Sequence, residues 1–168
     1  MLDRSLLPVF LGDHLALSTG AAELARRAAG TPTQAFLDGP LAGLAQELAA
    51  DRLAVLRAHE ILGIRPDRLK DRGAWLGEKL GRLKLNGRLT SSSPLSAVTE
   101  LQGLAALCGT MAGFWAGVQA VASDEPRLAE LDAAGRAAAM RERRDAVAAR
   151  VDGAVHAALV AQRPARPA

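Results

Sequence analysis

Apolar residues recur at the spacing of helix turns along most of the chain, and no segment alternates apolar and polar residues as a typical strand does. Four long segments carry the helical pattern, and clusters of Gly, Ser, Asp or Pro separate them. The expected helices span Leu2–Ala29, a second segment that ends at Leu62, Pro94 to the turn at Ser123, and Glu125 to about Gln162. Asp38-Gly39-Pro40 either starts the second helix or kinks it. The pattern therefore predicts an all-α protein.

The connections between these helices decide their arrangement. The turns at Gly30–Thr33 and Ser123–Pro126 are short, so each should join two antiparallel helices. About thirty residues separate Gly63, the expected stop of the second helix, from Pro94, and this is enough chain to return along a bundle. The third helix should then run parallel to the second. We expect one domain over residues 1–162 and a disordered tail at 163–168.

The long connection has a helical pattern of its own. Pro66 suits a first helical turn, and leucines follow on one side at Leu69, Leu76, Leu80 and Leu83. This short fifth helix should end at Asn86-Gly87, a dipeptide that is typical both of a helix C-cap and of a two-residue hairpin turn. We favour the C-cap, because an isolated hairpin on a helical scaffold is only marginally stable.

The positive charge of the chain is concentrated in the same connection. Residues 64–93 contain eight Lys or Arg and three acidic residues, whereas the whole chain has a formal charge of +3. A solvated charged surface is the simplest interpretation. The sharper one is an anion site, and nucleic acid is disfavoured because Trp75 is the only aromatic residue nearby. The anion-binding candidates are Arg82, Lys84, Asn86, Gly87 and Arg88.

The third helix contains an uncharged run, Leu101–Ser123, that is long enough to cross a membrane. Gln102, Thr110 and Gln119 make it more polar than a typical span, so we expect a buried core helix and no transmembrane segment. Its expected core face consists of Ala97, Leu101, Leu104, Cys108, Met111, Trp115 and Val118. A second face carries Gly109, Gly113 and Gly117, which would let a neighbouring helix or a second subunit approach closely.

Composition narrows the functional classes. Aromatic residues make up 3% of the chain and tyrosine is absent, so the core must be built mainly from Leu, Ala and Val. The lone Cys108 cannot form an internal disulfide, and Asp3, Arg4 and Pro8 interrupt any apolar region of a signal peptide. We therefore expect a cytoplasmic protein.

The order of hairpin, long crossover and hairpin over Leu11–Leu159 resembles the ferritin-like four-helix bundles. The segment LAQELAADRLAVLRAHEILGI is similar to the second helix of small bacterial stress-associated ferritin-like proteins. Three other segments resemble an uncharacterised bacterial family: LGDHLALSTGAAELARR, AWLGEKLGRLKLNGRL and SPLSAVTELQGL. The resemblance implies the bundle fold and an association with stress, and the uncharacterised family contributes no activity.

A di-iron bundle of this type needs two Glu-x-x-His pairs, and the chain contains none. Glu47 is followed three residues later by Ala50, and Glu142 by Asp145. We therefore expect a non-catalytic bundle without a cofactor, which acts as a homodimer or through an unknown protein partner. The alternative is a metal-binding ferritin-like oxidoreductase that holds iron or manganese through a set of noncanonical ligands. Those ligands would be His14, Glu47, Asp51 and Glu100.

Polar residues interrupt the expected core faces at one level of the bundle. If the hairpins fold back at residues 31 and 124, His14 lies level with Glu47 and Asp51, and Arg144 lies one turn from Glu100. Charges persist in a core only when they are paired. We therefore predict a buried network of His14, Asp51 and Arg144, extended by Glu100, in the position that a metal would take.

Overall fold

The computed structural model describes residues 4–66 and 95–160, and these residues form helices and no strand. The α-helices are α1 (Leu7–Ala28), α2 (Leu44–Leu62), α4 (Leu95–Val121), α5 (Ala133–Ala148) and α6 (Val151–Leu159). Three 3₁₀ helices connect them: η1 (Pro32–Phe36), η2 (Gly39–Leu41) and η3 (Pro126–Leu131). The all-α prediction is confirmed for this part of the chain.

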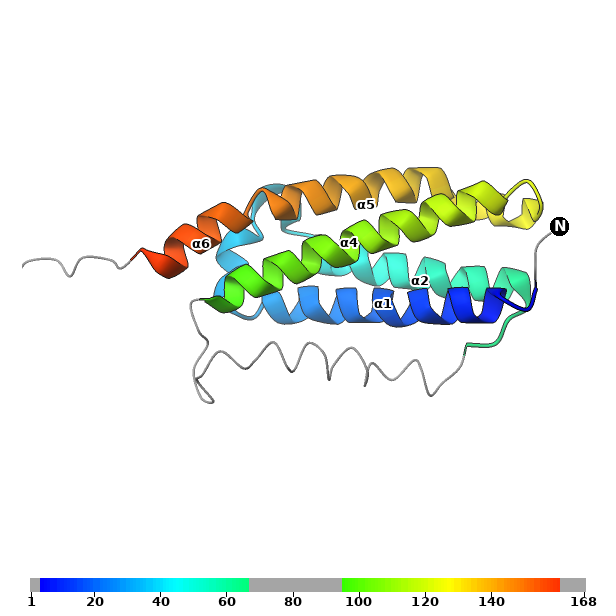
Figure 1. Cartoon of the computed structure of the whole chain (residues 1–168), viewed down its shortest axis with the longest axis horizontal. Coiled ribbons are helices and arrows are strands. Elements are labelled where there is room, and N and C mark those ends of the chain that lie inside the picture. The colour runs from blue at the N-terminus through cyan, green and yellow to red at the C-terminus, as the bar shows by residue number, and fades with distance from the viewer. Residues whose placement is uncertain (1–3, 67–94, 161–168) are drawn as a thin grey trace, which may run out of the picture.

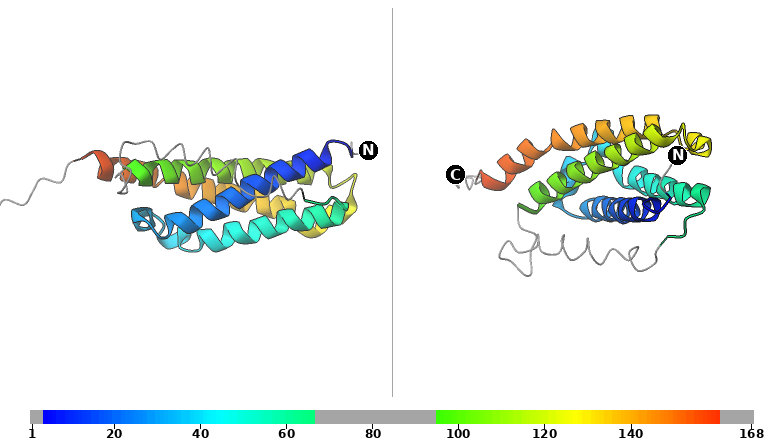
Figure 2. Two further views of the ribbon diagram at one scale, coloured as in Figure 1. Left: turned by 90° about the horizontal axis from the view of Figure 1, so that it is seen from below. Right: turned by 45° about the vertical axis from the view of Figure 1, so that its right-hand side comes forward.

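The helices run lengthwise along one bundle (Figures 1 and 2). Helices α1 and α2 are antiparallel, and so are α4 and α5. Helices α2 and α4 run in the same direction, so the end of α2 and the start of α4 lie at opposite ends of the bundle (Figure 1). This direction agrees with the length of the connection. The expected short helix and the anion-binding candidates Arg82, Lys84, Asn86, Gly87 and Arg88 lie outside the described residues.

Helix α4 is the centre of the fold, because it packs against α1, α5 and α6. Its expected core face is confirmed, since all seven of the predicted residues are buried. Trp115 and Phe114 are the largest fully buried side chains of the described residues. Within those residues α4 is also the one helix whose length and composition would allow it to cross a membrane, a test that a core helix of a soluble protein passes as well.

The end of α2 follows the prediction and its beginning does not. Gly63 has a left-handed conformation (φ 67°), and the N–H of Ile64 donates to the carbonyl of His59 at 2.9 Å, as in a glycine C-cap. The helix begins at Leu44, not at Asp38. Pro40 instead lies in the first turn of η2, because two 3₁₀ turns complete the connection from α1.

The predicted last helix is wrong as a single element, because the chain breaks it twice. Asp132 adopts a left-handed conformation (φ 46°), and its carboxylate accepts the N–H of Gly135 at 3.2 Å, which starts α5. A Cβ at residue 135 would overlap the Asp132 carboxylate, so this cap requires glycine. The second break lies at Ala149 and Arg150, where α5 gives way to α6.

Candidate functional site

Asp51 is the buried polar group at the centre of the bundle. Its side chain comes from the inner face of α2 and is 2% exposed. The indole Nε1 of Trp115 on α4 donates a hydrogen bond to Asp51 Oδ1 at 2.6 Å. The Nη1 of Arg136 on α5 lies 3.9 Å from the same oxygen, and its guanidinium carbon lies 5.3 Å from the centre of the Trp115 ring. Three helices therefore meet at one carboxyl group.

Burial dominates the electrostatics of this carboxyl. Removal from water raises the pKa of Asp51 to about 6, while the Trp115 hydrogen bond and the Arg136 charge lower it in part. The second oxygen, Oδ2, has no hydrogen-bond partner among the described residues. Asp51 is therefore a group whose charge changes near neutral pH inside a close-packed core.

The Asp51–Arg136 contact belongs to a series of ion pairs that joins α2 and the loop before it to η3, α5 and the break between α5 and α6. We call this series the ion-pair seam. The pairs run in antiparallel order, so the position on the first side falls as the position on the second side rises. They are Arg57–Glu130 at 2.7 Å, Asp51–Arg136 at 3.9 Å, Glu47–Arg143, and Asp38–Arg150 at 3.1 Å.

The seam follows from residue spacing. Arg136, Arg143 and Arg150 are seven residues apart, which places them on one side of the last helical region. Asp51 is more buried than the other acids of the seam, whose side chains are 38% (Glu47), 48% (Glu130) and 69% (Asp38) exposed. The three more exposed pairs are screened by salt and contribute little each. The Asp51–Arg136 pair differs from them, because the cost of burying the carboxyl outweighs the attraction of the arginine.

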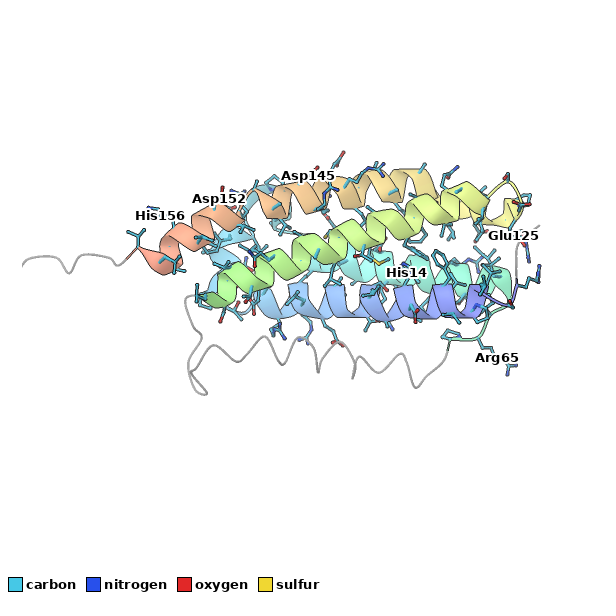
Figure 3. All side chains as sticks on the ribbon, viewed as in Figure 1. His14, Arg65, Glu125, Asp145, Asp152 and His156 are labelled. Atoms are coloured by element: carbon cyan, nitrogen blue, oxygen red, sulfur yellow. The ribbon has the colours of Figure 1, made fainter. Side chains whose placement is uncertain are left out.

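The predicted network of His14, Asp51, Arg144 and Glu100 is wrong in its partners. His14 is bonded through Nδ1 to the carbonyl of Phe10 at 2.7 Å and stacks on the Phe114 ring at 4.7 Å. Arg144 is 45% exposed and pairs with Asp145 on the outer edge of α5 (Figure 3). Asp51 alone of the four is fully buried, and its partners are Trp115 and Arg136, which the sequence did not suggest.

The error in Arg144 has a physical cause. A 3₁₀ helix rises about 2 Å per residue, against 1.5 Å for an α-helix, and η3 occupies the start of the predicted last helix. The level and rotation of α5 therefore differ from those of a continuous helix. Arg144 packs across Gly109, with its Cδ 3.4 Å from where a Cβ would lie. The aliphatic stem of Arg144 covers α4 while its charge stays in water.

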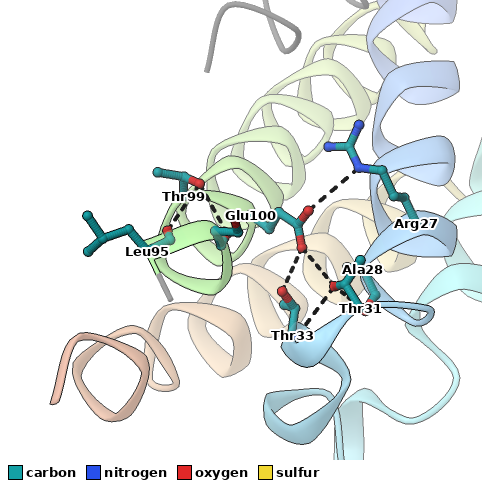
Figure 4. Close-up of polar contacts among 8 residues, drawn as sticks. Arg27, Ala28, Thr31, Thr33, Leu95, Thr99 and Glu100 are labelled. Atoms are coloured by element: carbon teal, nitrogen blue, oxygen red, sulfur yellow. Dashed lines mark hydrogen bonds and ion pairs between the residues drawn. The ribbon is translucent and has the colours of Figure 1, made fainter. Parts of the chain in front are cut away.

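Glu100 lies near the start of α4, beside the end of α1, in a polar cluster of its own (Figure 4). Its Oε2 accepts the hydroxyl of Thr33 at 2.6 Å and that of Thr31 at 3.1 Å. The Nε of Arg27 lies 3.6 Å from Oε1. This cluster fastens the end of α1 and the η1 turn to the first turns of α4, so its role is structural.

A Thr33→Val substitution tests that role. Thr33 is 1% exposed, so the loss of its hydroxyl should leave Glu100 short of one buried donor and lower the free energy of unfolding by about 1–2 kcal/mol. Urea denaturation monitored by circular dichroism measures the change. Thr110→Val is the matched control, because Thr110 is exposed on α4 and should change stability by less than about 0.5 kcal/mol. Equal losses in both variants would contradict the structural role of the cluster.

The described residues do not fit a metal centre. No three His, Cys, Asp or Glu side chains gather within residues 4–66 and 95–160. The four ligands of the metal alternative have separate partners, since Glu47 binds Arg143 while His14, Asp51 and Glu100 have the contacts given above. Asp152 and His156 are exposed on α6 (Figure 3). The geometry therefore supports no reaction step through iron or manganese.

Cys108 is equally unsuited to chemistry as a nucleophile. The side chain is fully buried, and burial together with the negative charge of Asp51 raises the pKa of its thiol to about 12. The reactive thiolate form is therefore negligible at neutral pH. Cys108 is a small core residue.

The exposed positions of α4 carry no charged side chain. They are Gln102, Ala106, Thr110, Gly113, Ala116, Gln119 and Ala120. Beside them lies the start of α1, where Leu6, Val9 and Phe10 are 64%, 52% and 36% exposed. We call the exposed residues Leu6, Val9, Phe10, Gly113, Ala116 and Ala120 the apolar patch. The ring of Phe10 joins the two helices, because its Cζ lies 3.5 Å from where a Cβ of Gly117 would be.

The glycines of α4 do not share one partner. Gly103 faces Leu24 of α1, Gly109 faces Arg144 of α5 and Gly117 faces Phe10, each with an atom within 3.5 Å of a Cβ position. Gly113 has no atom within 4 Å of that position. A close approach within the chain therefore explains three of the glycines and leaves Gly113 without a reason.

Comparisons with known proteins add no assignment. No protein-family model matches the chain, no curated protein matches it, and no solved structure matches it.

Proposed function

We propose that this chain is a non-catalytic helical bundle of the ferritin-like plan, and that it acts by self-association through the apolar patch. The observation that carries the proposal is the open space at Gly113 on an uncharged helix face. The partner is a second copy of the chain, packed with its α4 against the first around a twofold axis.

Energetics support a partner at Gly113. Glycine inside an exposed helix destabilises the helix by about 1 kcal/mol relative to alanine, and no neighbour within the described residues leaves too little room for a side chain at Gly113. The close approach of a second helix backbone would explain why residue 113 has no side chain. The absence of charge over the exposed face of α4 agrees with the core of an interface, which is depleted in charged residues.

The ferritin-like plan is supported by the directions in which the helices run. The two antiparallel pairs and the parallel course of α2 and α4 correspond to a bundle with one long crossover (Figure 1). The non-catalytic role is supported by the ion-pair seam and the Glu100 cluster. There the carboxylates that could bind a metal are instead paired with Arg, Trp and Thr side chains.

A Gly113→Arg substitution tests the proposal. A long charged side chain at the interface should weaken self-association by at least about tenfold, because the charge would be buried without a partner. Sedimentation velocity over a range of concentrations measures the association constant. The same substitution should raise the stability of the isolated chain by about 1 kcal/mol, since arginine favours a helix more than glycine does. This second readout separates a broken interface from a damaged fold.

Ala50→Arg is the matched control, because Ala50 is exposed on α2 away from the apolar patch. It adds the same charge and should leave the association constant within about twofold of the wild type, as expected for a surface substitution outside an interface. Equal association of wild type and Gly113→Arg would contradict the proposal.

A further inference from the structure

The two oxygens of Asp51 have different surroundings. Oδ1 accepts the Trp115 indole at 2.6 Å and lies 3.9 Å from Arg136. Oδ2 is buried and has no hydrogen-bond partner among the described residues. A carboxylate normally accepts hydrogen bonds at both oxygens, and here the charged form has a donor at Oδ1 only. The site therefore accommodates the neutral form more easily than an ordinary ion pair does.

The charged groups around Asp51 come from each element packed against it. On α2 itself, Glu47 is bound to Arg143, and the Nε of Arg52 donates to Thr19 Oγ1 of α1 at 2.8 Å. Helix α5 supplies Arg136 and Arg143. Among the described residues only Arg136 forms an ion pair with Asp51.

The remaining titratable neighbours are Cys108 of α4 and His14 of α1. The Cys108 thiol stays protonated, because burial raises its pKa to about 12. His14 is separated from the carboxyl by two rings, since it stacks on Phe114 at 4.7 Å and Phe114 meets Trp115 edge-on at 4.8 Å. A pH response of the site near neutrality therefore has Asp51 as its source and His14 as the group to control for.

We propose that proton binding at Asp51 decides whether Arg136 is held in the ion-pair seam, which makes the Asp51–Arg136 pair a pH-sensitive latch between α2 and α5. In the ionised state Arg136 bridges the two helices. In the neutral state the carboxyl still accepts the hydrogen bond from Trp115, but it no longer attracts the guanidinium group of Arg136. Arg136 then keeps its bond from Nε to the carbonyl of Leu131, at 2.7 Å, which lies within the η3–α5 segment and does not tie it to α2.

The position of Arg136 limits what the latch moves. The residue belongs to the first turn of α5, directly after the left-handed Asp132 that separates α5 from η3. The other three ion pairs of the seam, which involve Glu47, Glu130 and Asp38, do not include this carboxyl. The response is therefore a local loosening of η3 and the first turn of α5 as the pH falls, not an opening of the bundle. Burial raises the pKa of Asp51 to about 6, which places the change within a physiological range.

Fluorescence of Trp115 tests the latch. In a Trp75→Phe protein Trp115 is the only tryptophan, and its emission should change in one transition between pH 4.5 and 8 with a midpoint near 6. Asp51→Asn should abolish the transition. Arg136→Gln should raise its midpoint by up to about one pH unit, because a positive charge beside a carboxyl lowers its pKa. His14→Gln should leave the midpoint unchanged.

Two measurements on the wild type do not depend on variants that fold. The carboxyl ¹³C signal of Asp51 should titrate near pH 6, and amide exchange at residues 133–137, corrected for its intrinsic pH dependence, should be at least about threefold faster at pH 5 than at pH 7.5. A ¹³C midpoint below pH 4.5 would overturn the proposal. The proposal would also be overturned if the corrected amide exchange were the same at pH 5 and pH 7.5. The same holds if the fluorescence transition persisted in Asp51→Asn, or if its midpoint were unchanged in Arg136→Gln.

Discussion

Trp115→Ala should lower the free energy of unfolding by about 4 kcal/mol, one of the two largest effects that we expect from a single substitution in this protein. Trp115 is a fully buried residue of α4, so truncation leaves a large cavity in the core. The substitution also removes the donor to Asp51 Oδ1 and leaves a buried carboxyl without a hydrogen bond. Urea denaturation at pH 7, followed by circular dichroism, measures the loss.

Trp115→Phe separates the two contributions. The phenyl ring preserves most of the packed volume but cannot donate, so we expect a loss of about 1–3 kcal/mol from the missing hydrogen bond and the smaller ring. The pKa of Asp51 should rise further in this variant, since the indole bond lowers it. If Trp115→Ala cost less than about 1 kcal/mol, Trp115 could not be at the centre of the core.

The second large effect is the pH dependence of stability that Asp51 imposes. Burial raises the pKa of this carboxyl from 3.8 to about 6, so the folded state holds the proton more tightly than the unfolded chain does. The associated stability is fully present below about pH 4 and is lost as the pH rises through 6. A shift of about two units corresponds to ~3 kcal/mol.

Asp51→Asn removes this dependence. The stability of the variant relative to the wild type should therefore increase by ~3 kcal/mol between pH 4 and pH 8, whatever the constant offset from the new amide group. Urea titrations of both proteins at several pH values give the difference directly. A difference that stays flat over this range, or that falls with rising pH, would contradict a buried and destabilised carboxylate.

Sequence periodicity was sufficient for those parts of the fold that depend on local spacing. The core face of α4, from Ala97 to Val118, follows from apolar residues three and four apart, and Gly63 ends α2 because a left-handed residue is needed there. The common direction of α2 and α4 follows from the length of the connection between them. Each of these features needs information from one segment only.

The partners of Asp51 depend on several elements at once, and the sequence alone did not identify them. Its interruption of an apolar face indicated a buried polar group, which the structure confirms. The arginine that reaches it depends on the rise of η3 and on the left-handed turn at Asp132, which has no strong signal in the sequence. Helical spacing puts Trp115 in the core, but spacing carries no information about the acceptor of its indole N–H.

The seam itself had a signal that periodicity analysis could have found. Arginines at 136, 143 and 150 share one face at a spacing of seven, and the acids Asp51, Glu47 and Asp38 follow in reverse order on the other side. Complementary charges in antiparallel order favour one register of two helices over others. Glu100, by contrast, falls in the central layer only if its level is counted from Arg144 on a continuous last helix, whereas Thr31 and Thr33 hold it at the end of the bundle.

Sedimentation equilibrium of the wild-type protein tests self-association most directly. One chain has a mass of 17.5 kDa, and the apolar patch predicts a concentration-dependent approach to twice that mass, which Gly113→Arg should prevent. A mass of 17.5 kDa at every concentration up to the millimolar range would contradict it, because a patch without a second copy on it would then have no role in assembly.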